Sequence, residues 1–347
     1  MLAATATFAG QIEREGNPAL ILYEAGDRRL ELAGANVNPS MSGTFTPVPG
    51  LDLDSRNIQE SYQQYSLGLK YKIDDRWTLA ALINQPVGAD VKYAEGRPHP
   101  FSGAEATIEA LAINLLAKYQ ATDRISVFGG LRAQRVRGDV SLPPPFRYEL
   151  KTEYDEQFGY VVGAAFEIQE ILLRVAATYE SEVTHSFSDN NGAPFDVVKP
   201  QAFTLNLQSG INQKTLAFAS ARWRDWTEFQ IAPPDFGDVL GRPGAAIAFG
   251  TSDIWTFEVG IGRRITDRWS GIASIKYEED LGDTVGNLLA YDGFISYGLA
   301  AVYRRDKWDV IAGVRYVSFG DTRTTTIGAD FEGNSAVATG LRVAYRF

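Results

Sequence analysis

Few side chains in this sequence could support catalysis. His99 and His185 are the only two histidines, and the chain has no cysteine. Thiolate nucleophiles, disulfides, cysteine-bound metals and multi-histidine metal sites are therefore excluded. A serine hydrolase needs a serine, a histidine and an orienting polar group together, and the sequence arranges no such set around His99 or around His185-Ser186. We expect no catalytic residue, no metal and no cofactor, and we predict that the protein is not an enzyme.

Arginine is the residue type best suited here to bind a charged ligand. Arg222 and Arg224 flank Trp223, so in a strand their guanidinium groups share one face. A guanidinium binds a carboxylate through two parallel hydrogen bonds. We expect Arg222, Arg224 and Arg132 to face a ligand head group. For any single arginine, the stronger alternative is an ion pair with a glutamate or aspartate of a neighbouring strand.

Charge and hydropathy narrow the class of protein. The 347 residues carry a net charge of −10, and so acidic a chain is a poor nucleic-acid binder. Mean hydropathy is −0.17, and no stretch approaches the roughly 18–20 apolar residues of a membrane-spanning helix. A helical membrane protein is therefore excluded. A membrane β-barrel is not, because its strands alternate apolar and polar residues.

Most of the chain shows the two-residue period of β-strands. Across residues 308–316 every second residue is apolar, from Trp308 to Tyr316. These two aromatics lie roughly 26 Å apart along a strand, or about 20 Å along the membrane normal if the strand is tilted near 40°. That spacing is typical of an outer-membrane barrel with an aromatic girdle at each edge of its apolar band. A large soluble β-protein with scattered aromatics is the weaker alternative.

Turns and loops divide the alternating segments. Short polar turns such as Asp74-Asp75-Arg76 and Thr266-Asp267-Arg268 alternate with longer segments rich in Pro, Gly and Asp. Outer-membrane barrels have short periplasmic turns and long external loops. The sequence therefore predicts an all-β fold, a transmembrane antiparallel β-barrel of about 14 strands. The expected strands cover residues 28–44, 60–73, 76–93, 105–120, 124–140, 152–169, 171–187, 200–212, 214–230, 252–265, 268–281, 292–305, 307–321 and 335–347.

The first residues do not alternate in this way. They include apolar Leu2, Phe8, Ile12 and residues 20–23, but no secretory signal, and we expect that a signal peptide has been removed. A barrel of about fourteen strands has a lumen too wide for its own side chains to fill. We predict an N-terminal plug, or hatch, over residues 1–27 inside a barrel formed by residues 28–347. The alternative is a disordered periplasmic leader.

One proline interrupts an otherwise apolar strand. Pro86 cannot donate to a β-ladder, and a closed barrel has no edge at which to place it. Gly88 allows a sharp backbone path, and Asn84 and Gln85 are polar for a lipid-facing stretch. We predict that Asn84, Gln85, Pro86 and Gly88 form an inward kink that opens the barrel wall sideways. The alternative is a strand that simply ends before a loop.

In order and spacing, several motifs together resemble the FadL family of outer-membrane transporters for long-chain fatty acids and aromatic hydrocarbons. Asn17-Pro18-Ala19 looks like the family's hatch motif, and the terminal Tyr345-Arg346-Phe347 looks like the assembly signal of outer-membrane barrels in general. The other matching stretches are residues 30–32, 38–43, 77–88, 200–203 and 223–229. Residues 13–16 and Leu20 differ from the residues usual around the hatch motif. The loops at 138–151 and 187–199 are short, which suggests a different or smaller ligand.

The resemblance implies passive uptake of a hydrophobic small molecule, with possible lateral exit into the membrane. Asn17, Pro18 and Ala19 would hold the hatch, and Phe8, Leu20 and Leu22 would contact the ligand. It also implies the outer membrane of a Gram-negative bacterium. The expected partners are outer-membrane lipid and lipopolysaccharide, and the barrel assembly machinery through Phe347. We expect a monomer. The alternatives are a general diffusion porin for small polar solutes and, from another class, a barrel enzyme acting on lipids.

Overall fold

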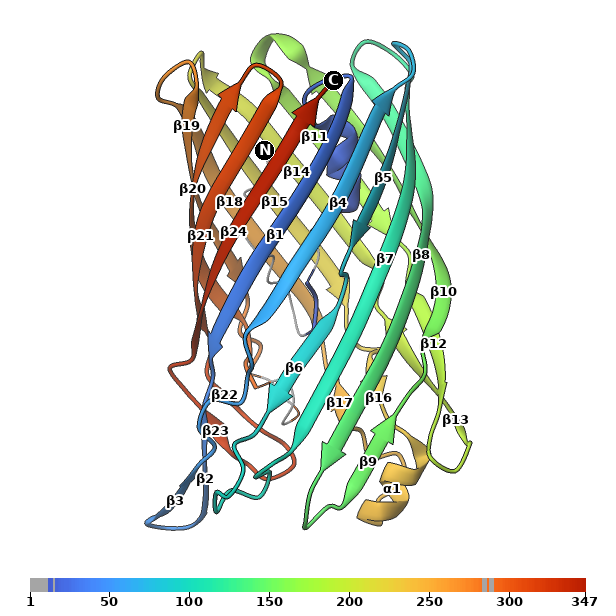
Figure 1. Cartoon of the computed structure of the whole chain (residues 1–347), viewed down its shortest axis with the longest axis vertical. Coiled ribbons are helices and arrows are strands. Elements are labelled where there is room, and N and C mark those ends of the chain that lie inside the picture. Colours follow the sequence, from blue (N-terminus) through green and yellow to red (C-terminus); the bar gives the residue numbers. More distant parts are fainter. Residues whose placement is uncertain (1–11, 15, 283–285, 287–289) are drawn as a thin grey trace.

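The computed structural model describes residues 12–14, 16–282, 286 and 290–347 as a closed antiparallel barrel of 14 strands (Figure 1). Each barrel strand pairs with the next along the chain, and β1 pairs with β24 to close the ring. The barrel strands are β1 (Arg28–Ser40), β4 (Tyr62–Lys72), β5 (Trp77–Asn84), β7 (Glu105–Gln120), β8 (Ile125–Leu142), β10 (Asp155–Ile168), β11 (Leu173–Glu180), β14 (Ala202–Asn212), β15 (Thr215–Asp225), β18 (Asp253–Arg264), β19 (Trp269–Glu278), β20 (Phe294–Arg305), β21 (Trp308–Phe319) and β24 (Ser335–Arg346). The predicted fold class is confirmed.

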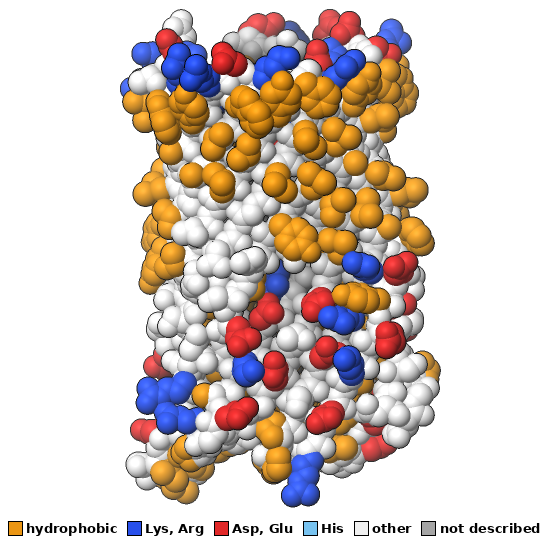
Figure 2. Space-filling model, in the orientation of Figure 1, with side chains coloured by type: hydrophobic (Ala, Val, Ile, Leu, Met, Phe, Trp, Pro, Cys, Tyr) orange, Lys and Arg blue, Asp and Glu red, His pale blue; other side chains and the backbone are white. Residues whose placement is uncertain are grey.

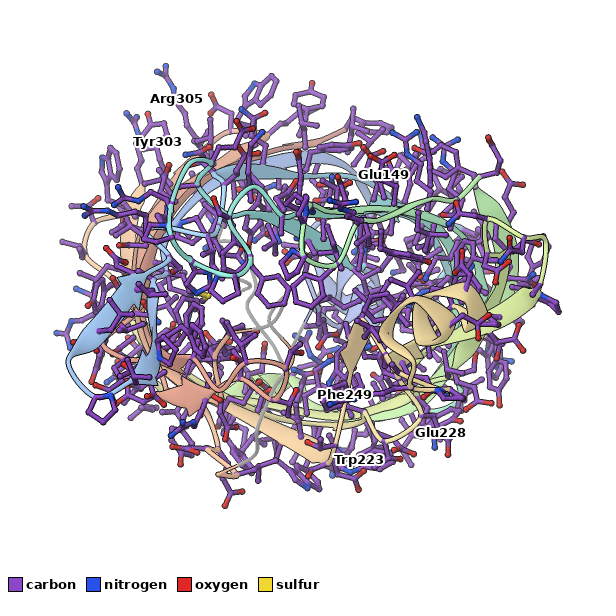
Figure 3. All side chains as sticks on the ribbon, turned by 90° about the horizontal axis from the view of Figure 1, so that it is seen from below. Glu149, Trp223, Glu228, Phe249, Tyr303 and Arg305 are labelled. Carbon is purple, nitrogen blue, oxygen red and sulfur yellow. The ribbon has the colours of Figure 1, made fainter. Side chains whose placement is uncertain are left out.

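Alternation decides which side chains face lipid. On β21, Trp308 and Tyr316 are 50% and 47% exposed, whereas Asp309 and Arg315 between them are 5% and 4% exposed. On the face shown in Figure 2, apolar side chains accordingly form a band next to one charged rim. Seen from the long-loop end, the strands surround a lumen into which side chains project (Figure 3). No helix among the described residues is long and apolar enough to cross a membrane.

The long-loop end is more ordered than the sequence predicts. The segments 45–58, 187–199 and 231–251, expected to be loops, contain hairpins and a helix because they bury an apolar cluster that includes Met41, Ile58 and Phe331. The elements at this end are β2 (Gly43–Val48), β3 (Leu51–Asp54), β6 (Gly88–Lys92), β9 (Tyr148–Lys151), β12 (Val183–Ser188), β13 (Pro194–Lys199), β16 (Gln230–Ile231), α1 (Pro234–Leu240), β17 (Ala248–Phe249), β22 (Thr322–Arg323) and β23 (Asp330–Phe331). A short helical turn, η2 (Gln169–Ile171), connects β10 and β11 at the opposite end.

The lumen contains a further short helix, η1 (Pro18–Tyr23), visible inside the barrel in Figure 1. Asn17 begins it, because its side-chain oxygen accepts a hydrogen bond from the Ala19 N–H (3.0 Å) and Pro18 fits the first helical position. Ala19, Ile21 and Leu22 are buried against wall residues. The wall residues in this cluster are Ala80, Leu116, Phe128 and Val161. The apolar side chains of η1 therefore pack it against the wall, and the Tyr23 hydroxyl adds a hydrogen bond with Ser126 Oγ (3.0 Å) on β8.

Gly163 on β10 makes room for this packing. A Cβ atom there would overlap the Phe128 ring and the carbonyl oxygen of Ala177. Phe128 in turn contacts the Tyr23 ring edge-on, with 6.0 Å between centroids.

We expect Gly163→Ala to lower the free energy of unfolding by about 1–3 kcal/mol, the usual cost of overpacking. Urea unfolding in lipid vesicles, followed by tryptophan fluorescence, measures this change. Gly34→Ala is the matched control, because the nearest atom to an added Cβ lies 3.9 Å away. Equal stability of the two variants would contradict the prediction.

Candidate functional site

The third transmembrane segment of the wall is broken. β5 ends at Asn84 and β6 begins at Gly88, as expected if Pro86 cannot continue the ladder. β5 pairs with β4 and β7, whereas β6 pairs in the barrel sheet only with β7. Pairing of β4 with β5 stops at Ser66 and Asn84, and the next backbone bond across this seam runs from the Glu60 N–H to the Asp90 carbonyl (3.0 Å).

Between these points lies what we term the wall window, the gap between residues 61–64 and residues 86–89. The described part of the chain shows no backbone hydrogen bond from one side of the window to the other. The Gln85 side chain partly compensates, since its Oε1 accepts a hydrogen bond from the Tyr65 N–H (2.9 Å). Tyr65 is the last aromatic of the outward apolar row on β4, so the window lies at the outer edge of the apolar band.

The N-terminal segment, which comprises the described residues 12–14 and 16–27, lines the window from inside. The Arg14 N–H donates to the Pro86 carbonyl (3.0 Å), and the Gly88 N–H donates to the Ile12 carbonyl (2.9 Å). The Arg14 guanidinium lies 3.8 Å from the centre of the Tyr62 ring and 2.6 Å from the Asp90 carboxylate. It contacts Gly88 so closely that a Cβ atom there would overlap it. Arg14 therefore joins both sides of the window.

A buried polar layer crosses the lumen beside this segment; it comprises Glu13, Arg132, Glu180, Arg222 and Arg224. Glu13 Oε1 accepts from Arg222 (2.7 Å) and from Arg224. Glu180 accepts from Arg222 (2.7 Å) and Arg132 (2.8 Å). All five side chains are at least nine-tenths buried. The three arginines expected to bind a ligand are thus paired with carboxylates.

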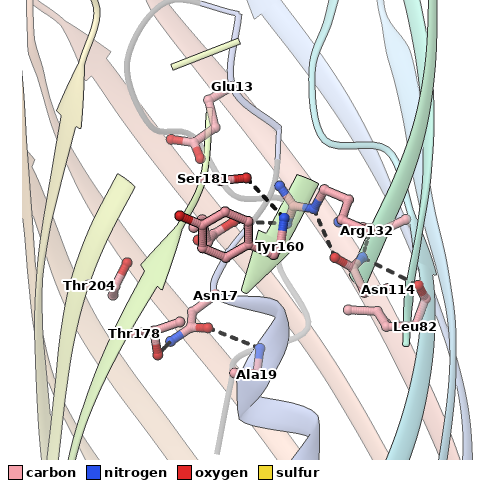
Figure 4. A network of polar contacts seen from close by, with 12 residues as sticks. Glu13, Asn17, Ala19, Leu82, Asn114, Arg132, Tyr160, Thr178, Ser181 and Thr204 are labelled. Atoms are coloured by element: carbon pink, nitrogen blue, oxygen red, sulfur yellow. Dashed lines mark hydrogen bonds and ion pairs between the residues drawn. The ribbon is translucent and has the colours of Figure 1, made fainter. Parts of the chain in front are cut away.

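Asn17 joins the N-terminal segment to the same region of the wall. Its Nδ2 donates to Thr178 Oγ1 (2.9 Å) on β11 and to Asn206 Oδ1 (2.8 Å) on β14. Figure 4 shows Asn17 and Glu13 on one side of this network, and Arg132 reaching Asn114 on the other. Asn114 also donates a hydrogen bond to Asn84 (3.0 Å), the last residue of β5. The hatch motif therefore lies where it can hold the N-terminal segment.

An apolar pocket lies on the long-loop side of the polar layer. We call it the outer pocket. Its walls come from the N-terminal segment, the broken strand and the long-loop elements. They include Ile12, Val87, Ala89, Val136, Phe187, Phe195, Val197, Trp226, Phe229 and Ala248. Its polar lining residues are Thr107, Gln134, Arg137, Thr152, His185 and Lys199. The pocket therefore adjoins the wall window through Val87 and Ala89.

A second cavity, of about 420 Å³, lies on the opposite side of the polar layer. Leu20, Tyr23 and Ser220 line it. Along β15, Trp226 just beyond the strand lines the outer pocket and Ser220 lines the second cavity, with Arg222 and Arg224 between them. The polar layer therefore separates the two spaces.

The residues expected to contact ligand occupy different places. Leu20 lines the second cavity, and Leu22 is 1% exposed against the wall. Phe8 lies outside the described residues. No local sequence pattern predicts a role for Glu13 or Arg14. Both nevertheless belong to the stretch, residues 13–16, that differs from the family pattern. Among the described residues, no group of three or more His, Asp or Glu could hold a metal ion.

Comparison with known proteins identifies the family of this chain. Residues 3–317 match the family described as outer membrane protein transport protein (OMPP1/FadL/TodX). The chain belongs to this family. The FadL/TodX family consists of transport channels, and family and barrel together indicate the outer membrane of a Gram-negative bacterium. Comparison with curated protein sequences gives no match.

Solved structures of similar fold come from the same family. A Pseudomonas aeruginosa FadL homologue is 16% identical, with a TM-score of 0.76 over 95% of this chain and 93% of the other. The P. putida toluene transporter TodX is 13% identical, with a TM-score of 0.68 over 95% and 92%. The Ralstonia pickettii toluene transporter TbuX is 13% identical, with a TM-score of 0.64 over 99% and 97%. At these identities the likeness concerns the fold.

The ion pairs of Glu13 generate a prediction about the FadL-type N-terminal segment. Because the chain has no cysteine, Ala19→Cys provides a single buried reporter. We expect Glu13→Gln in that background to raise the rate of maleimide labelling more than tenfold, since breaking a buried ion pair costs about 3–5 kcal/mol. Labelling is measured by mass shift in vesicles.

The matched control is Glu109→Gln, which removes an exposed partner of Arg137 (2.9 Å). Exposed pairs contribute about 0–1 kcal/mol, so labelling should not change. A Glu13→Gln rate equal to that of the control would show that Glu13 does not hold the segment.

Proposed function

We propose that the protein takes up a compact hydrophobic molecule from outside the cell and releases it sideways into the outer membrane, without energy or cofactor. The observation that carries this proposal is the position of the outer pocket. It adjoins the wall window, whereas the polar layer separates it from the periplasmic side. Membership of the family supports hydrophobic transport in general.

A ligand could leave the outer pocket along the barrel axis or through the wall window, and the free-energy cost of the two routes favours the window. Passage along the barrel axis requires an apolar molecule to disrupt the polar layer, and breaking one buried ion pair costs about 3–5 kcal/mol. Passage through the window requires Arg14 to move, and the ligand then enters lipid directly. That path avoids exposing apolar surface to water, which costs about 25 cal/mol per Å².

The size of the outer pocket supports a compact ligand. Its volume is about 70 Å³, whereas an apolar cavity of about 150 Å³ takes up benzene. The pocket would have to about double in volume to admit a single ring, and an extended acyl chain would require far more. The proposal therefore favours a molecule about the size of toluene, the compound that the name of the transporter TodX gives for that protein.

In this proposal residues 1–27 act as a hatch and residues 28–347 as the barrel. Asn17, Pro18 and Ala19 fix the hatch, while Leu20 and Leu22 place it against the second cavity and the wall. Arg132, Arg222 and Arg224 act through Glu13 and Glu180, and an acidic ligand would compete with Glu13 for them. The kink at Asn84, Gln85, Pro86 and Gly88 forms the exit.

The proposal also includes the expected surroundings. The protein would be a monomer. Its apolar band would contact outer-membrane lipid and lipopolysaccharide. Phe347 is 51% exposed at the end of the chain and stacks on Tyr345, with 6.2 Å between centroids. Such an accessible terminal aromatic suits recognition by the barrel assembly machinery.

Deletion of residues 1–26 separates a hatch from a diffusion porin. We expect the intact chain to be nearly silent in single-channel recordings, and the truncated barrel to conduct ions in steps, because the lumen of such a barrel is too wide to be filled by wall side chains alone. Heat-modified mobility confirms that the truncated barrel is folded. High conductance of the intact chain would favour the general diffusion porin.

Restoring the wall tests the lateral route. Replacement of residues 84–88 by Thr-Val-Thr-Val-Thr allows a regular strand to pair across the window. We expect it to abolish uptake of radiolabelled toluene by cells that express the protein, measured against cells that lack it. The same five residues placed at 270–274, within the continuous strand β19 and with threonine on its inner face, are the control. Undiminished uptake by the restored wall, with normal surface expression, would rule the route out.

A further inference from the structure

The side-chain groups of the outer pocket that have no hydrogen-bonding partner among the described residues include the Trp226 indole N–H, which is a donor, and the Gln134 amide oxygen, which is an acceptor. Gln134 lies on the inner face of β8, is 2% exposed and lines the pocket. Its side-chain nitrogen lies 3.1 Å from His185 Nε2. Its side-chain oxygen has no hydrogen-bond donor among the described residues. A buried acceptor without a partner is destabilising, so its retention in an apolar wall calls for a donor from elsewhere.

The neighbours of Gln134 fix which end of its amide is free. His185 Nδ1 lies 2.9 Å from an Asp155 carboxylate oxygen, which can only accept, so the ring carries its proton on Nδ1. Burial lowers the pKa of His185 at the long-loop end, against the opposing effect of Asp155, and the nearby Lys199 cation lowers it further. The neutral ring then accepts at Nε2. Gln134 must donate its amide N–H there, and its carbonyl oxygen remains free.

We propose that Gln134 Oε1 selects the substrate of the outer pocket, which is a compact apolar molecule bearing one hydrogen-bond donor, such as a phenolic or alcoholic hydroxyl group. This inference rests on the proposed function. The rest of the pocket contacts the hydrocarbon part through residues such as Val136, Phe187 and Trp226. A site built to bond a hydroxyl discriminates against the analogue that lacks it, because that analogue leaves the buried oxygen unpaired.

The alternative charged anchor in the pocket is the Lys199 cation, and the Trp226 indole N–H is a further, neutral donor. Lys199 is 4% exposed and also lines the pocket. A carboxylate would be its natural ligand. The two anchors therefore make opposite predictions, since a hydroxyl donates to Gln134 and an ionised carboxylate cannot.

The test compares 4-methylphenol, 1,4-dimethylbenzene and 4-methylbenzoate, three molecules of similar shape, by calorimetric titration of the full chain in detergent. We expect 4-methylphenol to bind about tenfold more tightly than 1,4-dimethylbenzene, the effect of one net hydrogen bond. Gln134→Leu should remove this preference, and Gln134→Met serves as a second variant of similar volume. Gln208→Leu, on the other side of the polar layer, is the control and should keep it.

Equal affinities of the intact chain for 4-methylphenol and 1,4-dimethylbenzene would overturn the hydroxyl preference and leave the proposed function standing. Tighter binding of 4-methylbenzoate than of 4-methylphenol would overturn it in favour of Lys199. Absence of binding by all three compounds would count against the outer pocket itself, and so against both proposals. A preference that persists in both Gln134 variants would show that another group recognises the hydroxyl.

Discussion

A peptide group without a hydrogen-bonding partner is costly in lipid, and this constraint governs the whole molecule. The barrel strands satisfy it by pairing with their neighbours around the ring. The exception is the segment interrupted at Pro86. There the backbone of residues 12–14 supplies the bonds to Pro86 and Gly88 that a neighbouring strand would otherwise make. The broken wall and the N-terminal segment are consequently one structural unit.

Two adjacent residues connect this unit to opposite sides of the lumen. In an extended chain, neighbouring side chains point in opposite directions. Glu13 reaches Arg222 and Arg224 on β15, while Arg14 reaches Asp90 and Tyr62 beside the window. Any movement that withdraws Glu13 also displaces Arg14. The charges that separate the outer pocket from the second cavity are thus coupled mechanically to the charge that occupies the window.

Much of the fold follows from local sequence pattern. Alternation identifies the strands and their lipid-facing sides, as at Trp308 and Asp309, because burial on a barrel depends on parity alone. Pro86 marks the break for an equally local reason. The partners of Glu13 and the role of Gln134 depend instead on residues far away in sequence, such as Arg222 and His185. No local sequence pattern predicts those contacts. The hairpins at the long-loop end are equally hard to predict, because they form around an apolar cluster that only the closed barrel brings together.

The contacts of the N-terminal segment also join parts of the chain that lie far apart in the sequence. Asn17 binds Thr178 and Asn206, and Glu13 binds Arg222 of β15, so the N-terminal segment needs partners that lie 161–209 positions further along the chain. The seam between β1 and β24 is the last pairing that the chain can make. In the closed barrel the N-terminal segment is enclosed by strands that follow it in the sequence, so the contents of the lumen and the ring around them are parts of one continuous chain.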